Sequence, residues 1–120
     1  MILILELIYQ TLKKLNEKEY DEINKLCNDI NIKWFASCWD VESLKFLKKY
    51  NCVYNKIASP MLTNYELINE VAKEGKHTFV STGMHTMEEI EKVLDIFKDA
   101  KKIFHIDPEG DIRLNRIVKE

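Results

Sequence analysis

The sequence predicts an α/β fold built from parallel βαβ units. Short apolar segments alternate with longer amphipathic segments, and most apolar segments are followed by a polar turn and a helix-capping residue. Strands that alternate with helices in this way form parallel sheets with right-handed crossovers. No low-complexity linker divides the chain, so residues 1–120 are expected to form a single domain, which is short for a complete α/β barrel.

Four strands are expected from runs rich in β-branched and aromatic residues. They cover residues 33–37, 53–59, 78–80 and 102–106. The apolar start of the chain, residues 1–5, suits either a short strand or the packed start of a helix, and the pattern leaves both open.

Helices are expected where apolar residues recur at helical spacing. The predicted helices cover residues 8–15, 17–29, 41–50, 65–74 and 87–98, and residues 112–119 suit a short helix or an irregular tail. The expected N-caps are Asn16, Asp40, Thr63 or Asn64, and Thr86. Glu19 and Glu89 lie three residues beyond the first and last of these caps, which is the spacing of a capping box. Gly75 is expected to end the third capped helix.

The turn after the third strand contains Ser81, Thr82 and Gly83. Gly83 is expected to permit a backbone turn that residues with a Cβ resist. Hydroxyls and free N–H groups at a strand-to-helix turn suit a phosphate group. The alternative is that the two hydroxyls only bond to the local backbone, which is common in turns.

Lys56 lies inside an otherwise apolar strand. A lysine that points into a barrel interior is costly unless an anion meets it, whereas an outward lysine extends its ammonium to solvent. The two readings weigh about equally on composition, and the hydroxyls of Ser59 and Ser81 favour the anion site.

Charge and cysteine content restrict the class of protein. The net charge is −2 with interleaved charges, which gives no reason to expect nucleic acid or a membrane as partner. Cys27, Cys38 and Cys52 show no paired metal spacing, and an odd count fits reduced thiols in the cytoplasm. Glu6 interrupts the apolar start, so neither a signal peptide nor a bilayer-spanning segment is expected.

The remaining candidate residues have ordinary structural interpretations. His77 and His85 are expected to be exposed, and His105 is expected to be a satisfied core histidine. No histidine is placed by the sequence to activate Cys38, so a nucleophilic role is not expected. Trp39 suits either a substrate-facing aromatic residue or a packing residue.

Three blocks of residues resemble the sialic acid synthase family, which comprises N-acetylneuraminate synthase and its pseudaminic and legionaminic acid relatives. The blocks are residues 34–40 (WFASCWD), 54–59 (YNKIAS) and 80–90 (VSTGM followed by TMEEI). Their order and spacing also match, and the resemblance runs from about residue 12 to residue 104. It implies a partial TIM (β/α)₈ barrel that comprises about strands three to six.

The resemblance also implies an activity and a site. The family condenses phosphoenolpyruvate with N-acetylmannosamine or a related sugar in nonulosonic acid and surface polysaccharide biosynthesis, using Mn²⁺ or Mg²⁺. Lys56, Ser59 and Ser81 match residues that hold phosphoenolpyruvate. Ser37 matches a hydroxyl residue near that ligand, and Trp39 matches an aromatic position in the site. No residue of this chain is assigned a catalytic role.

The chain departs from the family pattern in several places. The family's first two strands, which bear an acidic residue and a lysine, lie upstream of residue 1, and its metal-binding histidines lie downstream of residue 120. Met61 stands where an acidic or polar residue is common, and residues 106–108 replace a longer loop. The isolated chain is therefore expected to be inactive as a synthase. The alternative is a non-catalytic half-barrel that pairs with itself or with a complementing half.

Overall fold

A computed structural model describes residues 2–5, 15–99 and 104–107. Its five strands are β1 (Ile2–Leu5), β2 (Lys33–Ala36), β3 (Tyr54–Ile57), β4 (His77–Ser81) and β5 (Phe104–Asp107). Its helices are α1 (Glu17–Asp29), α2 (Val41–Lys48), α3 (Tyr65–Glu74) and α4 (Met87–Asp99), with a short 3₁₀ turn, η1 (Ser59–Met61). The alternation predicted from the sequence is therefore confirmed over the described residues.

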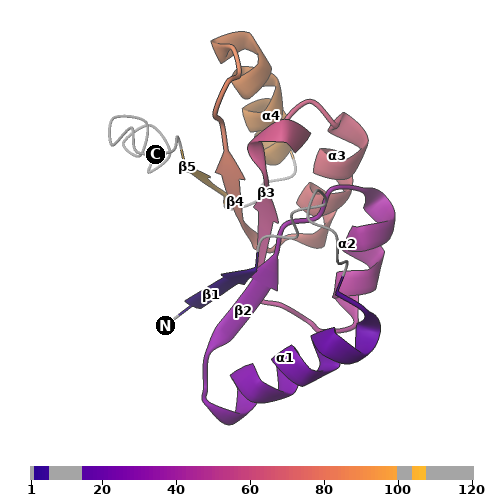
Figure 1. The fold of residues 1–120 in the computed structure, drawn as a ribbon. Coiled ribbons are helices and arrows are strands. Elements are labelled where there is room, and N and C mark those ends of the chain that lie inside the picture. The colour runs from indigo at the N-terminus through magenta and orange to yellow at the C-terminus, as the bar shows by residue number, and fades with distance from the viewer. Residues whose placement is uncertain (1, 6–14, 100–103, 108–120) are drawn as a thin grey trace.

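All strand pairs are parallel and follow the order of the sequence. β1 pairs with β2, and β3, β4 and β5 form a second sheet in that order. An isolated parallel bridge between Ser37 and Lys56 joins the end of β2 to β3. The five strands thus follow one another in sequence order across the two joined sheets, an arrangement that we call the fan. Figure 1 shows the helices along one side of the fan.

The two faces of the fan have different neighbours. Trp34 faces α1, where its indole N–H donates to Asn24 Oδ1 at 3.0 Å and its ring stacks on Tyr20. Successive side chains of a strand point to opposite faces. Phe35 accordingly lies on the other face, where it stacks on Phe79 with ring centroids 5.6 Å apart. We call this second face the inner face. It carries Phe35, Ser37, Tyr54, Lys56, His77, Phe79 and Ser81.

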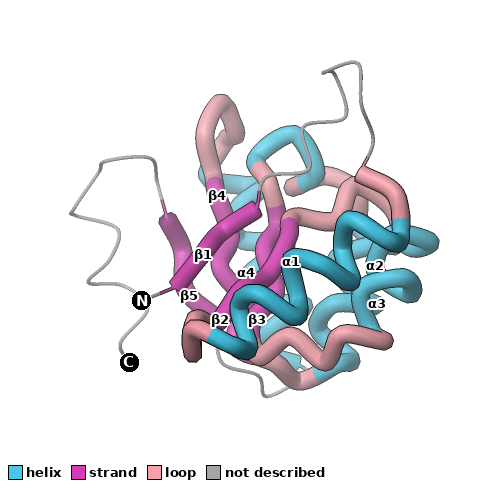
Figure 2. Tube along the Cα trace, turned by 60° about the horizontal axis from the view of Figure 1, so that its bottom comes forward, coloured by secondary structure: helices cyan, strands magenta, loops and turns pink. Residues whose placement is uncertain are grey.

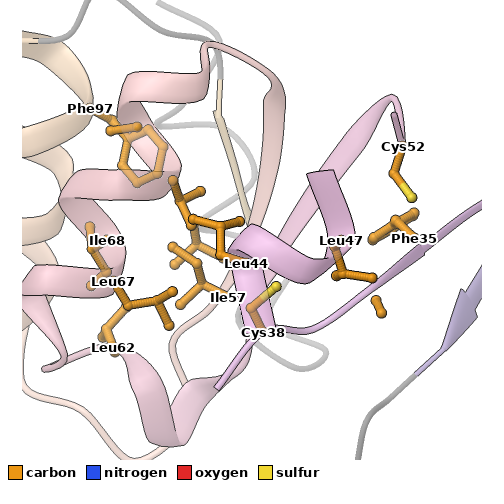
Figure 3. Packing of buried hydrophobic residues seen from close by; sticks show 14 of the residues in the cluster. Phe35, Cys38, Leu44, Leu47, Cys52, Ile57, Leu62, Leu67, Ile68 and Phe97 are labelled. Carbon is orange, nitrogen blue, oxygen red and sulfur yellow. The ribbon is translucent and has the colours of Figure 1, made fainter. Parts of the chain in front are cut away.

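The hydrophobic core lies between the strands and the helices. Ile57 of β3 is fully buried, and Figure 3 shows it among Leu44, Leu62 and Leu67. Phe97 of α4 is also fully buried. Each such side chain contributes about 1.5–3 kcal/mol when it is removed from water. Figure 2 shows α1, α2 and α3 as neighbouring helices in this layer. The core therefore fixes the strands whose opposite face carries the candidate site.

The helix ends follow the predicted local chemistry. Asn16 and Glu19 form a reciprocal capping box, and the Ser43 N–H donates to Asp40 Oδ1 at 2.6 Å. Of the two candidates for the third cap, Asn64 takes the role, because its Oδ1 accepts from the Leu67 N–H. Gly75 ends α3 with φ 71°.

Several element boundaries differ from the predictions. Residues 2–5 form the strand β1, so of the two alternatives for the apolar start the strand is confirmed over these residues. Ser59 opens η1 instead of ending a strand, because Pro60 cannot donate to a sheet ladder. Helix α2 ends at Lys48, two residues early, and Asn51 adopts φ 50° beyond it. The helix predicted over residues 8–15, apart from residue 15, and the tail at residues 112–119 lie outside the described residues.

No helix within the described residues has the length and apolar character needed to cross a membrane.

Candidate functional site

The centre of the candidate site is a contact between Lys56 and Ser81. The Lys56 ammonium donates to the Ser81 hydroxyl across the inner face of β3 and β4. Ser81 is only 6% exposed, and Lys56 is half-buried. The two residues are 25 positions apart in the sequence. They meet because parallel pairing aligns the carboxyl ends of adjacent strands, where α/β proteins bind ligands. The contact places a positive charge and a hydroxyl at that edge.

Ser37 lies beside this contact. It is the parallel bridge partner of Lys56, so the residue directly after β2 lies beside β3. The Ser37 hydroxyl is buried and has no hydrogen-bond partner among the described residues. A buried hydroxyl without a partner costs about 1–3 kcal/mol, so a polar ligand or water that bonds to Ser37 would remove this cost. Three of the four residues predicted for the phosphoenolpyruvate site therefore lie at the ends of adjacent strands or directly after them.

Ser59, the fourth residue, contacts a histidine of the turn between β4 and α4 through its backbone carbonyl. His85 Nε2 lies 2.6 Å from the Ser59 carbonyl oxygen, and His85 Nδ1 lies 2.9 Å from Glu89 Oε2. The His85 side chain is 14% exposed, so the prediction of an exposed histidine is wrong. The Thr86 backbone N–H, followed by the His85 ring, holds the pKa of Glu89 below its ordinary value. The spacing of His85 and Glu89, one helical turn apart, is the sequence signal that could have indicated this pair.

The turn that carries His85 contains a strained residue. Met84 has φ 63° and is fully exposed, whereas Gly83 does not have a positive φ. The prediction that Gly83 supplies the special backbone geometry is therefore wrong, because the left-handed position falls one residue later. A residue with a Cβ in this region costs about 1–2 kcal/mol. The turn is closed by the His85 N–H, which donates to the Thr82 carbonyl at 3.3 Å.

Trp39 and Cys38 occupy the turn between β2 and α2. Trp39 is half-buried, and its predicted role as a site aromatic stays a prediction. Cys38 is 3% exposed, and burial, followed by the charges of Glu74 and Asp40, raises the pKa of its thiol to about 12. A thiol with this pKa is protonated near neutral pH, and the expectation that Cys38 has no nucleophilic role stays a prediction.

The other two histidines lie on strands. His77 is half-buried on the inner face, with its ring 5.1 Å from that of Phe79 and 5.8 Å from that of Tyr54. The prediction that His77 is exposed is therefore wrong. His105 lies in β5 as the register partner of Phe79, and its predicted role as a satisfied core histidine stays a prediction.

A buried carboxylate at the opposite edge of the sheet was not predicted. Glu74, the last residue of α3, has a side chain 8% exposed, and its Oε2 accepts from Asn55 Nδ2 at 2.9 Å. Lys48 Nζ lies 3.6 Å from Glu74 Oε1, and Lys76 Nζ lies 3.5 Å from Oε2. This group, which we call the Glu74 network, joins α2, α3, β3 and the residue before β4. Its place near the amino ends of the strands separates it from the candidate site.

The resemblance implies that the family uses a divalent metal. Within residues 2–5, 15–99 and 104–107, no three histidine, cysteine, aspartate or glutamate side chains are placed to hold a metal ion. The described residues therefore do not fit that group, and no metal-dependent step is assigned to them.

Comparison with known proteins gives matches over most of the chain. The model of the NeuB family matches residues 5–106. Pseudaminic acid synthase of Campylobacter jejuni is 35% identical over 82 residues, which is 68% of this chain and 24% of that protein. N-acetylneuraminate-9-phosphate synthase of Drosophila melanogaster is 28% identical over 89 residues, which is 74% of this chain and 24% of that protein. The chain thus spans about a quarter of the length of these curated relatives.

Solved structures also match most of the chain. The N-acetylneuraminic acid synthetase of Leptospira borgpetersenii superposes with a TM-score of 0.74 at 30% identity, over 85% of this chain and 38% of that one. A phospho-2-dehydro-3-deoxyheptonate aldolase of Thermotoga maritima superposes with a TM-score of 0.75 at 13% identity, over 88% of this chain and 32% of that one, which shows a shared fold alone. Since the family model covers residues 5–106, the chain belongs to the NeuB family, in agreement with the resemblance of its three sequence blocks to sialic acid synthases.

Proposed function

We propose that this chain forms the phosphoenolpyruvate-holding part of a synthase barrel that acts in nonulosonic acid biosynthesis. In the complete reaction, phosphoenolpyruvate condenses with N-acetylmannosamine or a related N-acetylated amino sugar. The observation that carries the proposal is the contact between Lys56 and Ser81 at the carboxyl edge of β3 and β4. Its support is chemical, because an ammonium beside hydroxyls is suited to the phosphate and carboxylate of that ligand.

The fan of strands supports a barrel segment as the setting of this site. The strand order follows the sequence without the reversal that marks an open doubly wound sheet. The helices lie along one side, as the outer ring of a barrel does. We propose that β1–β5 are consecutive strands of such a barrel, one strand more than the four that the resemblance implies, because residues 2–5 form a strand that pairs with β2. We also propose that their inner face lines its interior. The described residues are assigned binding of phosphoenolpyruvate and not the complete condensation.

Calorimetric titration of the full chain with phosphoenolpyruvate tests this function. We expect saturable binding of phosphoenolpyruvate and much weaker binding of pyruvate, which lacks the phosphate that Lys56 and the hydroxyls would contact. A separate titration with inorganic phosphate measures how much of the affinity comes from the phosphate group alone. Absence of saturable binding, or equal affinity for pyruvate, would contradict the proposal.

A second candidate function is assembly with another barrel half, either a second copy or a complementing half. The observation that favours it is the inner face, where Tyr54, His77 and Phe79 are only half-buried although they form an aromatic cluster. Sedimentation velocity over a range of concentrations is expected to show association that Tyr54→Lys abolishes, because the substitution places a charge on that face. A monomer at all concentrations, alone and with the missing half supplied, would rule out this role.

A further inference from the structure

His85 connects two turns that the sequence separates by 26 residues. Its ring lies between the Ser59 carbonyl, at the start of η1 after β3, and Glu89, in the first turn of α4. Ser59 and Ser81 both belong to the candidate site: Ser59 is bonded to the ring directly, and Ser81 ends β4 just before the turn that carries His85. The ring therefore joins the β3–α3 turn to the β4–α4 turn at the edge where the ligand is proposed to bind.

The His85 ring has a hydrogen-bond acceptor beside each of its two nitrogens. The Ser59 carbonyl and the Glu89 carboxylate are both acceptors, so both ring nitrogens serve as donors only when the imidazole is protonated. Among the described residues, these two groups are the hydrogen-bond partners of the ring. Glu89 is itself fixed, since its Oε2 accepts from the Thr86 N–H at 3.0 Å and its own N–H donates to Thr86 Oγ1 at 3.2 Å. The ring is thus anchored on α4 and reaches across to the Ser59 turn.

The Ser59 turn keeps its own backbone hydrogen bonds without the histidine. The Leu62 N–H donates to the Ser59 carbonyl at 3.1 Å, and the Met61 N–H donates to the Ala58 carbonyl at 2.9 Å. Loss of the ring would therefore leave η1 formed, but would release it from the β4–α4 turn. The connection affects the position of Ser59 relative to Ser81 more than it affects the fold.

We propose that His85 is a positioning residue, which holds the Ser59 turn in register with Lys56 and Ser81 for binding of a phosphorylated carboxylate. This inference rests on the function proposed above. His85 touches neither Lys56 nor Ser81 through a described hydrogen bond, so its effect acts through the Ser59 backbone. The strained Met84 beside it is consistent with a turn whose shape is held by this connection.

Two substitutions separate the two bonds of the ring. His85→Gln places an amide N–H near the position of Nε2, so it retains a donor for the Ser59 carbonyl. His85→Asn places its amide near the position of Nδ1, so it retains only a partner for Glu89. Calorimetry with phosphoenolpyruvate is expected to give an affinity within about twofold of the unmodified chain for His85→Gln and about tenfold lower for His85→Asn. Lys92→Gln, on the exposed side of α4, is the matched control.

The outcomes distinguish the inference from the function on which it rests. If the unmodified chain does not bind phosphoenolpyruvate, the proposed function fails and the inference falls with it. If the unmodified chain binds but His85→Asn and His85→Gln have equal affinities, the function stands and the positioning role is overturned. Thermal melts of both variants test for a difference in stability. If His85 had a purely structural role, the variant with the lower affinity would also have the lower melting temperature.

Discussion

Replacing Glu74 with alanine is expected to lower the free energy of unfolding by about 2–4 kcal/mol, as measured by urea denaturation. The substitution leaves the Asn55 amide without its acceptor and leaves the ammonium groups of Lys48 and Lys76 without the carboxylate that lies between them. The Glu74 side chain is 8% exposed, so water replaces these contacts poorly. The loss is expected to exceed that of an ordinary surface ion pair because the carboxylate is buried.

Two further variants show whether the lower free energy of unfolding comes from loss of the Glu74 network or from a general effect of alanine in α3. Glu70→Ala lies on the same helix and removes only an ion pair with the exposed Lys73, so the free energy of unfolding is expected to remain almost unchanged. Glu74→Gln keeps an acceptor for the Asn55 amide. Its free energy of unfolding is therefore expected to lie between those of the unmodified chain and Glu74→Ala. Equal effects of Glu70→Ala and Glu74→Ala would show that the network does not stabilise the contact between α3 and β3.

Replacing Lys56 with methionine is expected to weaken phosphoenolpyruvate binding about 100-fold in calorimetric titrations. Methionine retains most of the length of the side chain and removes the charge that contacts Ser81 at the inner face. The melting temperature should not fall, because loss of a half-buried ammonium removes a desolvation cost. Binding and stability are therefore expected to respond differently to this one substitution.

Lys45→Met is the control for the loss of one positive charge. Lys45 lies on α2 and pairs with Glu42 at the surface, away from the inner face. If both methionine variants reduce binding equally, the effect comes from the net charge of the chain. If Lys56→Met binds as the unmodified chain does but unfolds at a lower temperature, Lys56 has a structural role and the anion site is wrong.

Local chemistry made the helices predictable. Asn16 caps α1 with Glu19, Asp40 caps α2, and Gly75 ends α3, and each of these contacts lies within a few residues of the sequence. The capping box of Thr86 and Glu89 was predictable for the same reason. Short-range hydrogen bonds of this kind require no knowledge of how the elements pack.

Long-range contacts were predictable only where a general rule of the fold applies. Lys56 and Ser81 could be placed together because the carboxyl ends of parallel strands share one edge. No such rule links Asn55 to Glu74, which are 19 residues apart, or Ser59 to His85. These contacts depend on the rotation of α3 and on the path of the β4–α4 turn. The left-handed residue in that turn is Met84, which its residue type gave no reason to expect.

Chemical-shift mapping of the ¹⁵N-labelled chain with phosphoenolpyruvate tests the central claim most directly, because it locates the ligand. We predict saturable shifts at the amides of Ser37, Lys56, Ser59 and Ser81, with little change at Lys48 and Lys76 in the Glu74 network. The latter two lysines form the matched comparison, since they supply positive charge at the opposite edge of the same strands. Shifts confined to Lys48 and Lys76, or none at the carboxyl edge, would contradict the assignment of a phosphoenolpyruvate site to β3 and β4.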